Sequence, residues 1–480
     1  MKPLRLLLGG VLWFFAGASI LSAANEPERP NILFILADDL GYGEVGAYGQ
    51  KMILTPALDN LAKEGMVFTR FYAGSSVCAP SRSVLVTGQH AGHTRVRGNA
   101  GRDLPEAQAL QSEDVTVARV LRDAGYTTGL IGKWGLGSET NAGEPKKQGF
   151  DYYFGFLSQT HAHNHYPDFL WRNGKRVSLP NDIVRSGKSE GTGYSKNRLA
   201  YANDLFFADA EKFITNHRGG PFFLYLALTT PHANNERARE LGDGNEVPIE
   251  EYADYDDRPW NTSQKGHAAM ITRMDRQIGQ LLKKLKELEL DGKTIVMFSS
   301  DNGPHSEGGP DYTPEFFHAS GPLRGIKRDL YEGGIREPMI VRWPGKVAAE
   351  ASSDHVAYFG DLMATWAELA GGKLPAHTDS ISFIPTLLGK NNQPAHEYLY
   401  WELYERGFSQ ALLLDGRWKA IRLETAAAPV QLFDLHTDPR EQADVAIRHP
   451  ELVARAQDLF VTARADNQYW RFNRTMTSAP

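Results

Sequence analysis

Short, continuous apolar runs alternate along the chain with segments whose apolar residues have helical spacing. The apolar runs are 31–37, 127–131, 221–228 and 294–298, and the helical segments are 56–64, 115–124, 200–216 and 268–288. Continuous apolar runs of this length are typical of strands covered on both faces. Strands that alternate with helices favour a parallel arrangement. We therefore predict an α/β fold with a mostly parallel central sheet and helices on both faces.

The pattern changes in the last quarter of the chain. Beyond Pro344 and Gly345 the alternation weakens, and from about His396 short aromatic or apolar segments are separated by polar turns. Such segments are typical of a small antiparallel sheet, and residues 450–465 have the pattern of a helix. We predict an α/β domain over residues 25–390 and a smaller C-terminal subdomain, an antiparallel sheet plus a helix, over residues 391–480.

The first residues have the order of a secretory signal. Lys2 and Arg5 precede an apolar run over 6–21, which small residues follow up to Ala24. This order predicts a signal peptide over residues 1–24 and an exported protein, periplasmic or secreted. A retained anchor is the alternative, but the run is shorter than the roughly 20 residues that span a membrane. We expect no stable membrane span in the mature chain.

Composition narrows the classes of protein further. The 480 residues are 41% hydrophobic and 23% charged, which is typical of a globular protein and excludes a disordered chain or a polytopic membrane protein. Lysine and arginine number 52 against 58 acidic residues, a net charge of −6. Nucleic-acid binding requires a dominant basic surface, so the balance gives no reason to expect that partner.

Polar residues follow the predicted strands. They are Asp38 and Asp39, Lys133, His232, and Asp301 with Asn302. In open parallel sheets, ligands bind outside the carboxyl ends of the strands. A single aspartate at a strand end is more often a helix cap or turn residue, but polar, reactive groups at several strand ends together predict a functional site.

Cys78 is the only cysteine, so it forms no internal disulfide. Pro80 suits a first helical turn and Gly88 a helix end, which predicts a helix that begins at Cys78. Helix N-termini attract anions through their free backbone N–H groups. A thiol packed in the core is the alternative interpretation of a lone cysteine.

Cys78-Ala79-Pro80-Ser81-Arg82 resembles the CxPSR signature of the type I sulfatases, the formylglycine-dependent branch of the alkaline-phosphatase superfamily. Further matching segments, in the family's order, are NILFILADDLGYGEVG, GLIGKWGLG, TPH, SSDNGPH, LRGIKRDLYEGGIREP and ALLLDGRWKAIRL. The resemblance covers most of residues 30–440 and extends to bacterial arylsulfatase-like and polysaccharide sulfatases. It implies that a maturase oxidises Cys78 to formylglycine, whose hydrated form attacks the sulfur of a sulfate ester.

The resemblance also implies roles for the strand-end residues. Asp38, Asp39, Asp301 and Asn302 offer hard oxygen ligands, which suit Ca²⁺ or Mg²⁺. The family favours one Ca²⁺ ion at these four residues and the modified Cys78. The remaining family roles are sulfate contacts for Lys133 and Lys327, stabilisation of the diol and carboxylates for Arg82, and protonation of the leaving oxygen for His232.

One position departs from the family pattern. Where the family commonly has GKWHLG, this chain has GKWGLG, with Gly135 in place of a histidine that assists sulfate expulsion. The nearest replacements are His161, His163 and His165. We prefer His163, and a packing or surface role is the alternative for each of the three.

Two other functions remain open at this stage. One is a phosphomonoester or phosphonate ester hydrolase of the same superfamily, and the other is a non-catalytic binder of sulfated glycans. For the substrate, basic and aromatic residues near the motifs favour a sulfated carbohydrate, with solvated charges and a packed domain junction as the alternative. They are Arg95, Arg97, Arg102, Arg324, Arg328 and the aromatic residues within 152–171 and 398–404.

Overall fold

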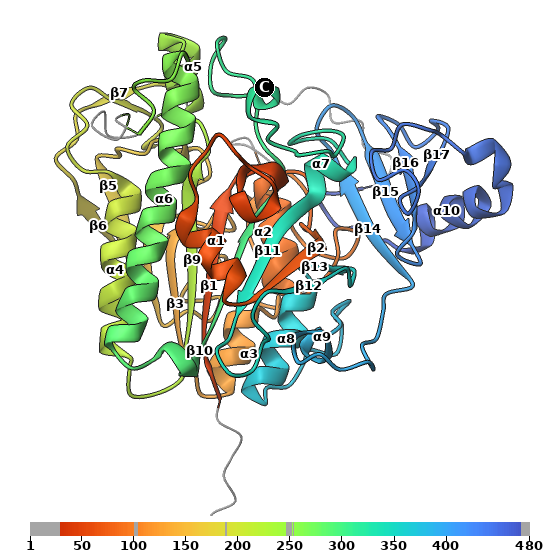
Figure 1. The fold of residues 1–480 in the computed structure, drawn as a ribbon, viewed down its shortest axis with the longest axis horizontal. Coiled ribbons are helices and arrows are strands. Elements are labelled where there is room, and N and C mark those ends of the chain that lie inside the picture. Colours follow the sequence, from red (N-terminus) through yellow and green to blue (C-terminus); the bar gives the residue numbers. More distant parts are fainter. Residues whose placement is uncertain (1–28, 100–103, 188–189, 246–251, 253, 472–480) are drawn as a thin grey trace, which may run out of the picture.

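The computed structural model describes residues 29–471 except 100–103, 188–189, 246–251 and 253. The predicted signal peptide and Arg102 lie outside the described residues. A large mixed sheet forms the centre of the molecule, and a small sheet lies beside it (Figure 1). The strands of the large sheet are β1 (Asn31–Asp38), β2 (Met66–Tyr72), β3 (Thr127–Lys133), β4 (Tyr152–Phe156), β5 (Phe169–Arg172), β6 (Lys175–Ser178), β9 (Phe222–Pro231), β10 (Thr294–Ser300), β11 (Arg336–Arg342), β12 (Ala351–Ser353) and β13 (Ala357–Tyr358).

The centre of this sheet is parallel, as predicted. The spatial order is β12-β2-β11-β10-β1-β9-β3-β4-β5-β6, with β13 also paired to β2. Strands β10, β1, β9, β3 and β4 run parallel to one another. The sequence pattern did not reveal the antiparallel pairs at both ends, β10–β11–β2 and β4–β5–β6.

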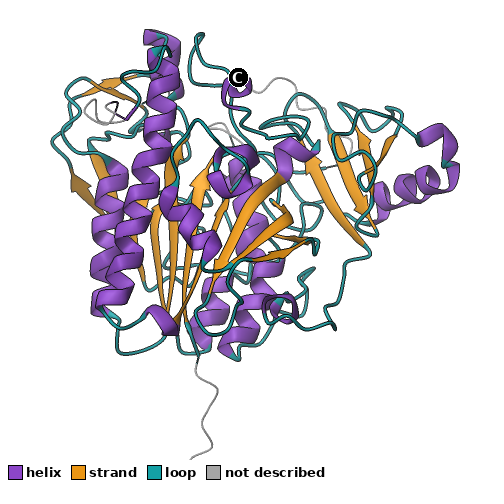
Figure 2. Ribbon diagram, in the orientation of Figure 1, coloured by secondary structure: helices purple, strands orange, loops and turns teal. Residues whose placement is uncertain are grey.

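Helices cover both faces of the sheet (Figure 2). One face carries α1 (Pro56–Lys63), α4 (Ala202–Asn216) and α6 (Thr262–Glu287), and the other carries α2 (Cys78–Thr87), α3 (Val117–Asp123) and α8 (Asp361–Ala370). Successive side chains of β1 serve the two cores in turn: Phe34 packs in the core of α2, α3 and α8, and Ile35 in that of α1, α4 and α6. Each fully buried side chain of this size contributes roughly 1.5–3 kcal/mol, so β1 is held from both sides.

Local signals explain where the flanking helices begin and end. Helix α6 begins six residues before the predicted segment at 268, because Asn261 and Gln264 form a capping box there. Helix α2 ends at Gly88, which has a φ of +66°, a conformation that glycine adopts without steric cost. The short helices are α5 (Asn235–Leu241), α7 (Glu332–Ile335) and α9 (Ile384–Leu387). Within the described ranges, none of the helices is long and apolar enough to cross a membrane.

The predicted antiparallel sheet and terminal helix lie at one side of the molecule (Figure 1). They comprise β14 (Tyr398–Leu403), β15 (Ser409–Leu414), β16 (Trp418–Arg422), β17 (Gln431–Asp434) and α10 (Pro450–Thr462), and a separate ribbon pairs β7 (Ile183–Arg185) with β8 (Gly193–Ser195). Lys419 of β16 reaches the main body, where its Nζ lies 2.9 Å from Glu332 Oε1. The same Nζ lies 3.5 Å from Oε1 of Glu441, which belongs to the C-terminal part of the chain. The side chains of Lys419 and Glu332 are fully buried. The boundary at residue 390 stays a prediction.

Candidate active site

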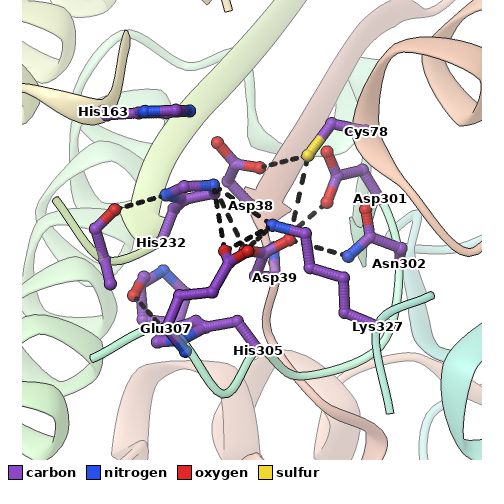
Figure 3. Close-up of polar contacts among 12 residues, drawn as sticks. Asp38, Asp39, Cys78, His163, His232, Asp301, Asn302, His305, Glu307 and Lys327 are labelled. Carbon is purple, nitrogen blue, oxygen red and sulfur yellow. Dashed lines mark hydrogen bonds and ion pairs between the residues drawn. The ribbon is translucent and has the colours of Figure 1, made fainter. Parts of the chain in front are cut away.

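Two neighbouring strands bring four acidic or amide side chains to one point (Figure 3). Parallel pairing of β1 with β10 sets Ala37 opposite Ser300, so Asp38 and Asp39 lie beside Asp301 and Asn302. The backbone N–H of Asp39 donates to Asp301 Oδ1 over 3.1 Å. All four side chains are buried. The structure thus brings together the residues predicted from the two strand ends.

Three cations hold these carboxylates in place. Arg82 contacts Asp301 Oδ2 through Nε at 2.9 Å and through NH2 at 2.8 Å. Lys133 Nζ lies 2.7 Å from Asp38 Oδ2, and Lys327 Nζ lies 2.8 Å from Asp39 Oδ2. Burial alone would raise the pKa of Asp38, but Lys133 and Arg82 outweigh it and lower that pKa to about 2. Asp38 is therefore ionised throughout the physiological pH range.

The acidic group fits a hard divalent cation. Asn302 Nδ2 donates to Asp39 Oδ1 over 2.7 Å, and this contact orients the amide. The amide oxygen of Asn302, Oδ1, is buried and has no hydrogen-bond partner among the described residues. Burial and the charge of Asp38 raise the pKa of Asp301 to about 7, because ionisation of a third carboxyl at this point is unfavourable without an added cation. An unpartnered oxygen beside three carboxylates is the donor set that Ca²⁺ prefers.

Cys78 is the first residue of α2 and faces this group (Figure 3). Its Sγ lies 3.4 Å from Asp38 Oδ1 and 3.8 Å from Asp39 Oδ1. Burial and the charge of Asp301 raise the pKa of the thiol well above its ordinary value. The unmodified side chain is therefore a protonated thiol and a poor nucleophile, because thiolates carry out cysteine chemistry.

His232 follows β9 and closes the other side of the site. Its Nδ1 donates to the carbonyl oxygen of Ala233 over 2.6 Å, which leaves Nε2 facing the cluster. This Nε2 lies 3.2 Å from Lys327 Nζ, 3.4 Å from Asp39 Oδ2 and 3.9 Å from Glu307 Oε2. The position of Nε2 at the buried end of the site lets this atom accept or deliver a proton there.

The structure separates the three candidate histidines. The ring of His163 stacks on that of His232, with 4.8 Å between centroids, and its Nδ1 lies 3.1 Å from Glu236 Oε2. His161 is buried against Phe156 and Phe169, and burial lowers its pKa to about 3. His165 Nε2 donates to the carbonyl oxygen of His232 over 2.7 Å. Only His163 of the three stacks on the ring of His232.

The place that a side chain would take at position 135 is filled. A Cβ added to Gly135 would lie 2.2 Å from Gln159 Nε2, and Gly135 has a φ of +77°. Gln159 Nε2 is buried and has no hydrogen-bond partner among the residues that the structure describes. Gln159 was not among the residues predicted from the sequence, although the glycine in GKWGLG marks the position that the Gln159 side chain covers.

Two more residues, near Lys327 and His232, were not predicted from the sequence. Glu307 Oε2 lies 2.9 Å from Lys327 Nζ, and its Oε1 lies 2.7 Å from an Arg328 nitrogen. His305 Nε2 donates to the carbonyl oxygen of Pro231 over 3.1 Å. His305 was quoted within SSDNGPH, and Glu307 follows it by two residues.

The arginines considered as substrate contacts already have partners. Arg95 pairs with Glu113 and Asp114, and the buried Arg97 pairs with Glu402. Arg324 NH1 donates to the carbonyl oxygen of Glu441 over 2.7 Å. The charges of Arg95 and Arg97 are therefore neutralised within the chain, whereas the contact of Arg324 is to an uncharged carbonyl.

Comparison with known proteins identifies the family. The model of the sulfatase family matches residues 30–372, and that of the N-sulphoglucosamine sulphohydrolase C-terminal region matches residues 326–459. An N-acetylgalactosamine-6-O-sulfatase of Bacteroides thetaiotaomicron is 30% identical, over 93% of this chain and 97% of that protein. The dog N-acetylgalactosamine-6-sulfatase is 31% identical, over 88% of this chain and 77% of that protein.

Solved structures agree with the sequence matches. The crystal structure of Ps i-CgsB in complex with k-i-k-neocarrahexaose superposes with a TM-score of 0.75 and 28% identity, over 93% of this chain and 96% of that chain. Its fold and the family matches bear out the α/β architecture and the enzyme class predicted from the sequence. The chain belongs to the sulfatase family and is a sulfatase.

Proposed function

We propose that this sulfatase cleaves the sulfate monoester of a carbohydrate, with formylglycine made from Cys78 as its nucleophile and one Ca²⁺ ion as its cofactor. The position of Cys78 carries the proposal. Cys78 begins helix α2, and its Sγ lies 3.4 Å from Asp38 Oδ1, beside the carboxylates that would hold the cation. We infer that a maturase oxidises Cys78 to formylglycine. Curated relatives named for N-acetylgalactosamine 6-sulfate support a carbohydrate substrate.

Asp38, Asp39, Asp301, Asn302 and the modified Cys78 would hold the cation. Bound there, Ca²⁺ would supply positive charge that polarises the sulfate and favours ionisation of the nucleophile. Ca²⁺ is favoured over Mg²⁺ because four closely placed protein oxygens suit a cation that accepts many protein ligands, whereas Mg²⁺ usually keeps several waters.

The chain's own groups account for the first half-reaction. One hydroxyl of the hydrated aldehyde forms a bond to sulfur while the bond from sulfur to the alcohol oxygen breaks. Lys133 and Lys327 bind the sulfate oxygens, and Arg82 steadies the carboxylates around the nucleophile. His232 Nε2 delivers a proton to the departing alcohol oxygen, since its other nitrogen is engaged by a backbone carbonyl.

The second half-reaction returns the aldehyde. The remaining hydroxyl loses its proton, the C=O bond forms again, and the bond from carbon to the sulfated oxygen breaks to release sulfate. We propose that His163 assists this step, held by Glu236 and stacked on His232. Water then hydrates the aldehyde for the next cycle.

The same proposal covers export and domain limits. We infer that residues 1–24 are a signal peptide and that the mature chain acts in the periplasm or outside the cell. The α/β domain over 25–390 would carry the chemistry, with the antiparallel sheet and helix in 391–480.

Mass spectrometry combined with turnover tests the proposal. The peptide that contains Cys78 should carry an aldehyde in active protein, and the enzyme should release sulfate from an aryl sulfate faster than phosphate from the matching phosphate monoester or phosphonate ester. Cys78→Ala should abolish turnover, and Cys78→Ser should stall as a sulfated serine. An unmodified thiol in fully active protein would refute the nucleophile. Faster phosphate release would favour the phosphohydrolase, and sugar binding without turnover by aldehyde-containing protein would favour the glycan binder.

A further inference from the structure

Four polar side chains connect the N-terminus of α2 with the lysine and histidine of the site. We call Asn99, Glu405, Arg328 and Glu307 the polar row. Asn99 Oδ1 accepts the backbone N–H of Ala79 over 3.3 Å, and Asn99 Nδ2 donates to Glu405 Oε1 over 3.1 Å. Asn99, at this end of the row, therefore contacts the residue that follows Cys78 in α2.

The other end of the row reaches the sulfate-binding groups. Arg328 Nε donates to Glu405 Oε2 over 2.7 Å, and another Arg328 nitrogen lies 2.7 Å from Glu307 Oε1. Glu307 Oε2 in turn lies 2.9 Å from Lys327 Nζ and 3.9 Å from His232 Nε2. The row thus links the residue after Cys78 to Lys327 and to His232, the proposed proton donor.

Exposure places the row outside the buried anion site. The side chains of Glu307 and Glu405 are each 18% exposed and that of Arg328 is 23% exposed, against 3% for Lys327 and 2% for His232. A bound sulfate group fills the buried end, so the alcohol part of the ester points toward solvent. The side chains of the polar row are therefore the groups that this alcohol part would contact.

The backbone of Arg328 is fixed close to the segment that carries Cys78. Arg328 has a φ of +76°, a conformation that residues with a side chain seldom adopt. Its backbone N–H donates to the carbonyl oxygen of Ser76 over 2.9 Å. This contact holds the backbone from which the guanidinium reaches both carboxylates.

The charge of the row and the free lone pairs of its carboxylates indicate which chemical groups it can bind. The four residues of the row carry a net charge of −1, because the carboxylates of Glu307 and Glu405 share the single guanidinium of Arg328. Lys327 is not counted in this sum. Each carboxylate oxygen accepts one contact along the row and retains capacity for another donor. Hydroxyl and amide N–H groups of a sugar are such donors. A second sulfate or a uronate carboxylate offers only acceptors and is repelled by the like charge.

We propose that the polar row is the sugar subsite and that it selects a singly sulfated unit with free hydroxyl or amide groups next to the reacting ester. The inference rests on the proposed sulfatase reaction and adds its specificity. The pairing of Arg95 and Arg97 with carboxylates agrees, because the charges of these two arginines are already neutralised within the chain.

Matched substrates test the selection. Matured enzyme with Ca²⁺ is assayed on N-acetylgalactosamine 4-sulfate, 6-sulfate and 4,6-disulfate, and on an aryl sulfate. We expect kcat/KM for the better monosulfate to exceed that for the disulfate by about tenfold or more, as expected for unfavourable charge contacts and lost hydrogen bonds to charged groups. Glu405→Gln keeps the size of the side chain but removes its charge, and should lower this preference about tenfold.

Two further variants, one inside the polar row and one outside it, test whether the change in substrate preference is specific to the row. Asn99→Ala frees Glu405 on one side and should raise KM for the monosulfate relative to that for the aryl ester. Glu397→Gln is the matched control, because Glu397 lies in the same subdomain with its side chain 78% exposed, on the surface against Arg455. Its monosulfate-to-disulfate ratio should equal that of the unmodified chain, and thermal melting confirms that each variant is folded.

The outcomes separate the inference from the proposed function. Equal turnover of monosulfate and disulfate, or an unchanged ratio in folded Glu405→Gln, would overturn the sugar subsite and leave the sulfatase mechanism intact. Cleavage of the aryl ester alone would overturn it as well. If matured protein releases no sulfate from any ester, the mechanism fails, and calorimetric binding of the same sugars to Cys78→Ala then decides the subsite by the same preference.

Discussion

The imidazole rings of His163 and His232 lie nearly parallel, with 13° between their planes and 4.8 Å between their centroids. Each ring is held by a different partner: Glu236 contacts Nδ1 of His163, and the carbonyl oxygen of Ala233 accepts from Nδ1 of His232. Burial and the charge of Lys327 lower the pKa of His232 well below its ordinary value, and the neighbouring His163 adds to this lowering.

His163→Phe should keep the stacked ring and lose proton transfer. We expect kcat on an aryl sulfate to fall about a hundredfold, the lower range for loss of an acid–base group, with little change in melting temperature. If His163 assists expulsion, the sulfated enzyme should accumulate in rapid-quench mass spectra. His436→Phe, at an exposed site, is the control. Unchanged kcat in His163→Phe would remove this residue from the mechanism.

Removal of divalent ions should abolish turnover, and added Ca²⁺ should restore it. Asn302→Ala removes the unpartnered amide oxygen of the acidic group. We expect the Ca²⁺ concentration for half-maximal activity to rise at least about tenfold, since even outer-shell partners contribute that much to metal affinity. Titration of chelated enzyme followed by sulfate release measures this. Full activity in excess chelator would contradict the metal site.

Gly135→Ala should destabilise the fold, because the new Cβ would overlap Gln159 Nε2 at 2.2 Å. Overpacking of this kind costs about 1–3 kcal/mol in the free energy of unfolding. Adding Gln159→Ala should recover the part that is due to overlap. Gly389→Ala is the control, because Gly389 also has a positive φ, +64°, and its Cβ would meet no atom within 4 Å. Urea denaturation gives the comparison, and a Gly135→Ala chain as stable as the control would show that Gln159 yields freely.

His396 should make stability depend on pH near neutrality. Burial alone would lower the pKa of His396, but Asp361, whose Oδ1 lies 2.8 Å from Nε2, outweighs burial and raises it above 6.5. The contribution is complete below the unfolded pKa and is lost as pH rises through the higher folded pKa. The difference in unfolding free energy between the unmodified chain and His396→Gln should therefore shrink as pH rises from about 6 to 9. A constant difference would contradict the shift.

The acidic centre of the site could be predicted because it follows regular structure. Asp38 and Asp301 end two continuous apolar strands, and parallel neighbours place their carboxyl ends together. The central sheet followed from the same alternation. The antiparallel strand β11 lies between β10 and β2, which are far apart in the chain, and no periodicity in a single sequence specifies such a pairing.

The remaining site residues lie in loops, where no pattern marks them. Glu307, Glu405 and Asn99 come from three segments that are distant in the sequence. No sequence pattern indicated which side chains they contact in the fold. The three nearby histidines looked alike as residues. Burial distinguishes them: His161 packs between aromatic rings, while His163 reaches the ring of His232.

The ion pair of Lys419 with Glu332 joins the small C-terminal sheet to the main body, so the stability of each part depends on the other. Glu332 belongs to the segment that also supplies Lys327 and Arg328, and its carboxylate is fully buried against Lys419. A chain shortened before β16 would lose the nearer counter-charge of this buried carboxylate and keep only Arg336, whose NH1 lies 3.4 Å from Glu332 Oε2. Loss of one partner of a buried ion pair typically costs about 3–5 kcal/mol, and Arg336 should reduce that cost. A chimera that takes its C-terminal sheet from a relative must therefore bring a lysine to the same place, or the segment that holds Lys327 and Arg328 is destabilised.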